Sequence, residues 1–221
     1  MAAYDRITTV RTMKSTGIVP VFYDGDTEIC KKMVAACYDG GARVFEFTNR
    51  GDNAQAIFED LIYYVKQELK DMILGIGSVI DPATTALYLQ LGANFIVSPI
   101  VNKDMAKICN RRKVAWIPGC GSVTEISYAE ELGAEMVKIF PGSSIGGPSF
   151  VKAVKGPLPW TSIMATGGVS LDQEGLLPWF EAGVNCIGAG SNLFCRDGNG
   201  AYDFGAITDL LKKSRDLIFH H

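Results

Sequence analysis

Histidine is almost absent from the sequence, and its scarcity limits the chemistry to be expected. The two histidines, His220 and His221, end the chain, where chains commonly fray. The six cysteines include no C-x-x-C pair, so in a chain of 221 residues we expect reduced, buried thiols rather than a disulfide framework or a zinc site. A histidine base and a metal centre are therefore not expected.

Runs of basic residues and long apolar stretches are also missing. The formal net charge is −3 and lysine and arginine form no stripe, which argues against nucleic acids and anionic membranes as partners. No apolar run has the length of a membrane span, and residues 1–17 lack the apolar segment of a signal peptide. We therefore predict a cytoplasmic protein. Because no Pro-, Gly- or Ser-rich linker divides the chain, we also predict that residues 1–221 form a single domain.

Four segments of the sequence resemble one another, and each joins a helical pattern to a short apolar strand at a glycine. These glycines are Gly41, Gly92, Gly133 and Gly183. A glycine at this place ends a helix, and the separations suit two strand–helix units rather than one. The expected intervening strands lie at residues 17–22, 72–77, 114–119 and 162–168.

Helical segments with recognisable starts separate these strands. Asp81 precedes a first-turn proline, residues 122–125 (SVTE) form a capping box, and residues 4–15 are expected to form a leading helix. Alternating strands and helices imply a parallel sheet, and eight units in this length favour a (β/α)8 barrel, the TIM-barrel fold. An open doubly wound sheet is the alternative.

Two charged residues occupy strand positions between apolar neighbours. Glu46 lies between two phenylalanines, and Lys138 lies between a valine and an isoleucine. Successive side chains of a strand point to opposite faces, so the apolar neighbours are expected to face the outer helices while Glu46 and Lys138 point into the barrel. Both stand at the same step after their repeat glycine, which places them with Val97 and Gly188 in one interior layer.

This pair has two interpretations. It is either a buried structural ion pair, which is costly to desolvate, or a reactive pair. Burial disfavours the ammonium form of lysine, so the pKa of Lys138 is expected to fall from about 10.4 toward neutrality. A neutral amine is a nucleophile, and Glu46 would then serve as its proton shuttle. We favour the reactive pair.

The ends of the predicted strands supply further candidates, because active sites of such barrels gather at the C-terminal ends. Arg50 carries a planar guanidinium suited to a carboxylate, unless it is only a surface arginine. The last two strands end in TGG, residues 166–168, and GAGS, residues 188–191. Glycine-rich turns at these two strands are a frequent phosphate site, although glycines also serve tight turns alone.

Motifs for nucleotides and cofactors are missing. GAGS lacks the third glycine of a dinucleotide fingerprint and follows the last strand instead of the first. Neither a P-loop nor a cluster of metal ligands occurs in the sequence. We therefore predict no cofactor.

Eight stretches, taken in order, resemble the 2-keto-3-deoxy-6-phosphogluconate (KDPG) and 4-hydroxy-2-oxoglutarate (KHG) aldolase family. They are GIVPV, FEFTNR, GIGSV, FIVSP, IPGCGSVTE, VKIFPG, ATGGV and IGAGS. The resemblance covers nearly the whole chain. It implies a homotrimeric (β/α)8 barrel and a metal-free class I aldolase, which forms a Schiff base between a lysine and pyruvate.

The resemblance also implies roles for single residues. Lys138 in VKIFPG is similar to the Schiff-base lysine, and Glu46 in FEFTNR is similar to the acid/base. Around the pyruvate, Arg50 and Ser78 resemble carboxylate-binding residues, with Ser78 where the family usually has threonine, and Pro99 and Phe140 resemble the walls. The residues similar to the distal hydroxyl- and phosphate-binding end are Thr166, Gly167, Gly168 and Ser191. Residues 142–144 (GSS) replace a usual Ala-Glu, which leaves the preferred sugar acid open.

The expected function is retro-aldol cleavage of KDPG to pyruvate and glyceraldehyde 3-phosphate in sugar-acid catabolism, with a 2-keto sugar acid phosphate as the small-molecule partner. The 4-epimeric galactonate compound and KHG are the alternative substrates. A phosphate-binding isomerase or epimerase and a catalytically silent sugar-phosphate sensor are alternatives of other classes. Neither requires an inward lysine that faces an acid, so both are less favoured.

Overall fold

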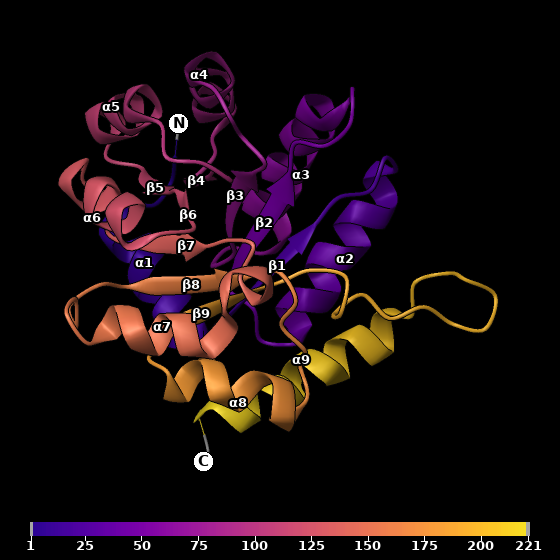
Figure 1. The fold of residues 1–221 in the computed structure, drawn as a ribbon. Helices are drawn as coiled ribbons and strands as arrows, with labels where there is room; N and C mark the ends of the chain where they lie inside the picture. The colour runs from indigo at the N-terminus through magenta and orange to yellow at the C-terminus, as the bar shows by residue number, and fades with distance from the viewer. Residues whose placement is uncertain (1, 220–221) are drawn as a thin grey trace.

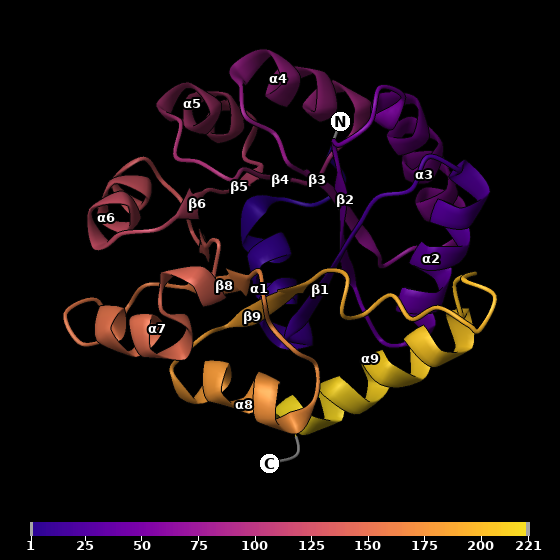
Figure 2. The same cartoon turned by 45° about the vertical axis from the view of Figure 1, so that its right-hand side comes forward.

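The computed structural model describes residues 2–219, and His220 and His221 lie outside the described residues. Parallel strands form a nearly closed barrel inside a ring of helices (Figures 1 and 2). The strands are β1 Ile18–Phe22, β2 Val44–Thr48, β3 Ile73–Gly77, β4 Phe95–Val97, β5 Ala115–Ile117, β6 Gly119–Cys120, β7 Val137–Ile139, β8 Ile163–Thr166 and β9 Cys186–Ala189. Their order is β5-β4-β3-β2-β1-β9-β8-β7-β6, which confirms the predicted TIM barrel over the open sheet.

The fifth strand of the barrel differs from the prediction of one strand over residues 114–119. Pro118 divides it into β5, which pairs with β4, and β6, which pairs with β7. Proline has no N–H to donate to a neighbouring strand, so the ladder is interrupted there. The Pro118 carbonyl remains useful, because it accepts a hydrogen bond of 2.8 Å from the backbone N–H of Lys138. This hydrogen bond joins the fifth strand to β7 at Lys138, the predicted nucleophile.

Helices α2 to α8 connect successive strands on the outside of the barrel, and α9 follows the last strand (Figure 2). They are α2 Thr27–Asp39, α3 Ala54–Glu68, α4 Pro82–Leu91, α5 Lys103–Arg112, α6 Val123–Glu131, α7 Gly147–Lys155, α8 Gln173–Glu181 and α9 Phe204–Phe219, with the 3-10 turn η1 Ser143–Ile145 before α7. The predicted starts are confirmed: the Asp81 side chain accepts the N–H of Thr84, and Ser122 accepts that of Glu125. The four repeat glycines all have positive φ, as helix-ending glycines should.

The leading helix, α1 Arg6–Thr16, begins and ends slightly later than the predicted residues 4–15. It begins after Asp5, whose side chain accepts the N–H of Thr8, and ends at Gly17, which has a φ of 73°. Val10 and Met13 of this helix pack with inward residues of the strands. The helix therefore plugs the N-terminal end of the barrel and leaves the C-terminal end for the site.

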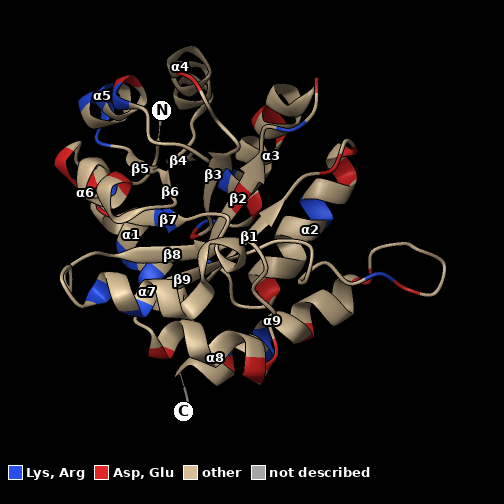
Figure 3. Ribbon diagram, in the orientation of Figure 1, with Lys and Arg blue, Asp and Glu red and all other residues tan. Residues whose placement is uncertain are grey.

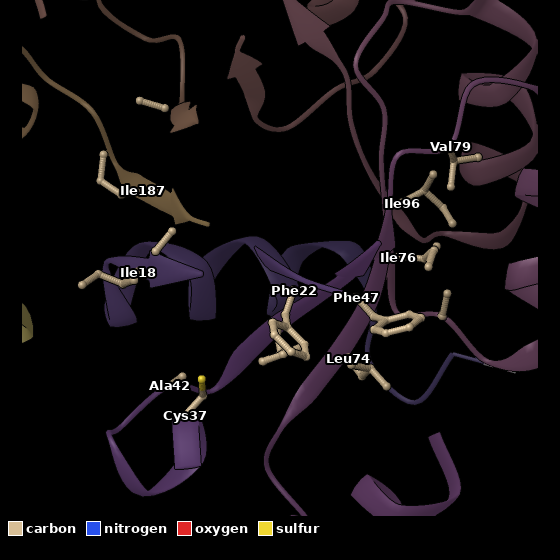
Figure 4. Packing of buried hydrophobic residues seen from close by; sticks show 14 of the residues in the cluster. Ile18, Phe22, Cys37, Ala42, Phe47, Leu74, Ile76, Val79, Ile96 and Ile187 are labelled. Atoms are coloured by element: carbon tan, nitrogen blue, oxygen red, sulfur yellow. The ribbon is translucent and has the colours of Figure 1, made fainter. Parts of the chain in front are cut away.

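Two apolar layers confirm the predicted alternation along the strands. Phe45 and Phe47 belong to the outer layer between strands and helices, part of which Figure 4 shows. Val44 belongs to the inner layer, together with residues such as Val97 and Met164 of other strands. Glu46 has the same strand parity as Val44, so its side chain points into the barrel.

Among residues 2–219, no helix has the length and apolar character needed to cross a membrane.

Candidate active site

Glu46 is a buried carboxylate in the middle of β2. It is only 1% exposed, and its Oε2 atom has no hydrogen-bond partner. The carboxylate lies directly over Gly77 of β3, where a Cβ atom would stand 1.7 Å from Oε1. Burial raises the pKa of Glu46, and the positive charges of Lys138 and Arg50 oppose that rise. An unpartnered carboxyl with a raised pKa is suited to proton transfer.

Lys138 is the corresponding buried amine on β7. It is 5% exposed, and its Nζ atom lies 4.8 Å from the centroid of the Phe140 ring. Burial lowers the pKa of Lys138, the nearby charge of Arg50 lowers it further, and Glu46 acts in the opposite direction. A larger fraction of Lys138 is therefore neutral than for an ordinary lysine, and the neutral amine is the form that acts as a nucleophile.

The acid and the amine share the barrel interior without forming a close ion pair. Each affects the pKa of the other, yet within the described chain their charged atoms do not approach within 4.0 Å. The less favoured alternative of a structural ion pair therefore has no direct contact behind it among the described residues. Figure 3 shows charged segments mostly on the outer helices, with further charge on β2 and β7 inside the ring.

Arg50 lies four residues after Glu46, at the C-terminal end of β2. Its Nε donates a 3.2 Å hydrogen bond to the hydroxyl of Ser78, which follows β3. Ser78 has a φ of 59°, an uncommon backbone conformation for a residue other than glycine. Arg50 is exposed and lines a cavity of about 240 Å³ at this end of the barrel. Its exposure agrees with the alternative of a surface arginine, while its place on the cavity and its bond to Ser78 agree with a binding role.

The two glycine-rich turns lie side by side on the same cavity. Thr166, Gly167, Gly168 and Ser191 all line it. Gly167 and Gly168 have φ of 97° and 76°, and Asn192 joins the turns through a 2.9 Å hydrogen bond to the Val169 carbonyl. Within residues 2–219, the N–H groups of Gly168 and Ser191 donate to no protein acceptor. Adjacent unpartnered N–H groups at such turns can bind an anion.

The expected walls also come to this end of the barrel. Phe140 lines the cavity, whereas Pro99 does not. The Pro99 carbonyl instead comes close to Gly119, where a Cβ would stand 2.5 Å from it, and Gly119 is the β6 partner of Lys138. The GSS loop borders the site as well, because Ser143 donates its N–H to Gly167 and its hydroxyl lies against Gly168.

Two parts of the site are not among the residues inferred from the sequence. The Tyr88 hydroxyl on α4 donates a 2.8 Å hydrogen bond to Asn49, the residue before Arg50. A tyrosine on the buried face of a helix looks like any core residue in the sequence. Arg196, in the loop after β9, lines a second cavity next to the first, and a single arginine in a polar loop gives no sequence signal of its own.

Known proteins resemble this chain over most of its length. The family model described as KDPG and KHG aldolase matches residues 9–210. The chain belongs to the KDPG and KHG aldolase family. The 2-dehydro-3-deoxy-phosphogluconate aldolase of Pseudoalteromonas atlantica is 32% identical over 198 residues, which cover 89% of each chain. The KHG/KDPG aldolase of Escherichia coli strain K12 is 31% identical over 209 residues, which cover 94% of this chain and 95% of the relative.

A solved structure supports the same family. The crystal structure of KDPG aldolase from Legionella pneumophila, with pyruvate captured at low pH as a covalent carbinolamine intermediate, has a TM-score of 0.79 to this chain. The two are 26% identical, and the match covers 91% of this chain and 95% of the other. The predicted family and its barrel fold are therefore confirmed. In this KDPG/KHG aldolase-family barrel, no three His, Cys, Asp or Glu side chains of residues 2–219 gather as metal ligands would.

Proposed function

We propose that the chain is a class I aldolase that cleaves KDPG to pyruvate and glyceraldehyde 3-phosphate through a Schiff base on Lys138. The observation that carries this proposal is that a buried amine, whose pKa is lowered, and a buried carboxyl, whose pKa is raised, lie inside the same barrel and act on each other's charge. Aldolase chemistry uses both groups: a neutral amine to attack a ketone and an acid/base to move protons.

The first step makes the covalent intermediate. The Lys138 amine attacks the C2 ketone of the substrate and forms a carbinolamine. Glu46 gives a proton to the carbinolamine hydroxyl, which leaves as water, and a positively charged iminium remains. The carboxyl of Glu46 makes no hydrogen bond through Oε2 in the free protein, so it is available for this transfer.

The second step breaks the carbon–carbon bond. Glu46, now a carboxylate, takes the proton of the C4 hydroxyl while the C3–C4 bond breaks. The electron pair of the C3–C4 bond moves into the iminium and gives an enamine, and glyceraldehyde 3-phosphate leaves. Protonation of the enamine at C3 and hydrolysis of the iminium then release pyruvate and restore the amine. The positive charge of the iminium is balanced by the nearby carboxylate in a buried environment, where electrostatic effects are strong.

The remaining residues are assigned to binding. Arg50, held by Ser78, would bind the C1 carboxylate, and Phe140 would contact the pyruvate methyl group. The turns at residues 166–168 and 188–191 would bind the distal hydroxyl and phosphate groups. The names of the relatives, KDPG aldolase and KHG/KDPG aldolase, support this substrate class. A homotrimer and a cytoplasmic location remain part of the proposal.

A substrate panel tests the activity. Release of pyruvate from KDPG, from its 4-epimer and from KHG is measured for the wild type and for two variants. We expect Lys138→Met to abolish cleavage and Glu46→Gln to slow it by about 10²–10⁴, the usual range for an acid/base group. Lys152→Met, at an exposed lysine on α7, is the control and should retain full activity. Cleavage by Lys138→Met at the wild-type rate would contradict the proposal.

A further inference from the structure

A second cavity, of about 570 Å³, adjoins the active-site cavity at the C-terminal end of the barrel. The two cavities share Val21, Arg50 and Ser191 as lining residues. Part of the lining of the second cavity comes from the connection between β9 and α9, a long loop in Figure 1. Arg196 and Tyr202 of this loop line the cavity. The region therefore extends the substrate site outward from Ser191.

Local contacts hold Arg196 in place. Its backbone forms an antiparallel bridge with Tyr202, and its Nη1 donates a 2.6 Å hydrogen bond to the carbonyl of Gly200. The guanidinium carbon lies 4.0 Å from the centroid of the Tyr202 ring, so the planar group stacks on the aromatic face. The Asp197 side chain accepts the N–H of Ala201 and stabilises the turn between the two paired residues. Arg196 is thus pre-ordered although it is exposed.

The charges around this cavity favour an anion. A guanidinium has five N–H donors, and within residues 2–219 a single one of those of Arg196 donates to a protein acceptor, the Gly200 carbonyl. No carboxylate of residues 2–219 pairs with it within 4.0 Å. The lining contains two arginines, Arg50 and Arg196, and neither aspartate nor glutamate, in a chain whose net charge is −3. Among the lining residues the positive charge with unused donors suits an anionic ligand, while the nearest carboxylates are engaged elsewhere: Asp24 at the Tyr202 hydroxyl and Asp197 within the turn.

We propose that Arg196 binds the terminal phosphate of the substrate, beyond the glycine-rich turns, and selects phosphorylated six-carbon 2-keto acids over KHG. This inference rests on the proposed aldolase function. When the C2 atom is bonded to Lys138, the phosphate stands four carbons further along and points out of the barrel toward Ser191, where the cavities join. A phosphate dianion can accept two parallel hydrogen bonds from one guanidinium. KHG ends at its fifth carbon and does not extend as far.

Kinetics with Arg196→Ala and Arg196→Lys test this selection. For KDPG we expect Arg196→Ala to raise KM about tenfold or more, the effect of losing a charge-assisted hydrogen bond, with kcat less affected. KHG cleavage should change less than twofold. Arg196→Lys should recover part of the loss, because it keeps the charge without the planar fork. Arg112→Ala, at an exposed arginine of α5 remote from both cavities, is the matched control and should leave both substrates unaffected.

Equal losses on KDPG and KHG, or an unchanged KM for KDPG in Arg196→Ala, would overturn the inference. A direct binding measurement tests the role of Arg196 independently of the aldolase proposal. Titration of wild type and Arg196→Ala with glycerol 3-phosphate should give a weaker Kd for the variant, whether or not the wild type cleaves any substrate. An unchanged Kd contradicts the role of Arg196, whereas a wild type that binds the phosphate ester and cleaves nothing contradicts the proposed function alone.

Discussion

A single methyl group at Gly77 should disable the acid/base without unfolding the barrel. Gly77 ends β3 and pairs with Thr48 of β2, and its Cα faces the Glu46 carboxylate. In Gly77→Ala the new Cβ would stand 1.7 Å from Oε1, 2.5 Å from Cδ and 2.9 Å from Cγ of Glu46. The shortest ordinary contact is 3.4 Å, so the carboxylate must withdraw by about 1.7 Å.

The expected loss of activity follows from this displacement. A misplacement of about 1 Å at a reacting group can reduce the rate about 10²-fold, and the carboxylate moves further than that. We therefore expect kcat to fall by at least about 10², approaching but not exceeding the effect of Glu46→Gln. The fold should survive, because Gly77 does not have a positive φ and the atoms met by the methyl group belong to the far end of a flexible side chain.

The assay is steady-state cleavage of KDPG together with thermal unfolding. Gly25→Ala is the matched control, because nothing lies within 4 Å of the position of its Cβ. It should leave both kcat and Tm unchanged. The reasoning would be refuted by a folded Gly77→Ala protein with kcat within twofold of the wild type while Glu46→Gln is strongly impaired.

Three further changes address phosphate binding, stability and positioning. Ser191→Asp should reduce kcat/KM far more for KDPG than for KHG, because its charge repels the phosphate; equal reductions would remove the phosphate assignment. Glu46→Gln combined with Lys138→Met should raise the unfolding free energy in urea by about 1–4 kcal/mol near pH 7. The part of that gain due to Glu46 should disappear toward pH 4.5, because the unfolded glutamate then also binds its proton, whereas the part due to Lys138 should remain, because its lowered folded pKa still disfavours the charged amine; a loss of stability would contradict the burial argument. Tyr88→Phe removes the donor to Asn49, so we expect about 0.5–1.5 kcal/mol less stability and a raised KM for 2-keto acids, whereas an unchanged KM would make Tyr88 purely structural.

Local rules made the barrel and the burial of Glu46 and Lys138 inside it predictable from the sequence. The direction of the Glu46 and Lys138 side chains depends only on strand alternation, and the repeat glycines fix where each strand begins. The interruption at Pro118 was also readable in principle, because proline cannot donate within a sheet. The boundary between β5 and β6 therefore follows from Pro118 itself and not from a contact with a distant segment.

The contacts between distant segments could not be predicted in this way. The hydrogen bond from Tyr88 to Asn49 joins α4 to the end of β2. The alternation of apolar residues does not predict this contact. Arg196 lies in a polar loop, where periodicity does not distinguish a side chain that faces a cavity from one that faces solvent. The approach of Ser143 to Gly168 likewise depends on how two loops pack after the barrel closes.

The most direct test of the central claim is reductive trapping of pyruvate on the protein. Borohydride added with pyruvate should reduce the iminium irreversibly, and peptide mapping by mass spectrometry should place the adduct on Lys138. Lys152 and Lys155 of α7 should remain unmodified, and Lys138→Met should give no adduct. Absence of any adduct on the wild type, or an adduct on another lysine with Lys138 unmodified, would contradict the Schiff-base mechanism.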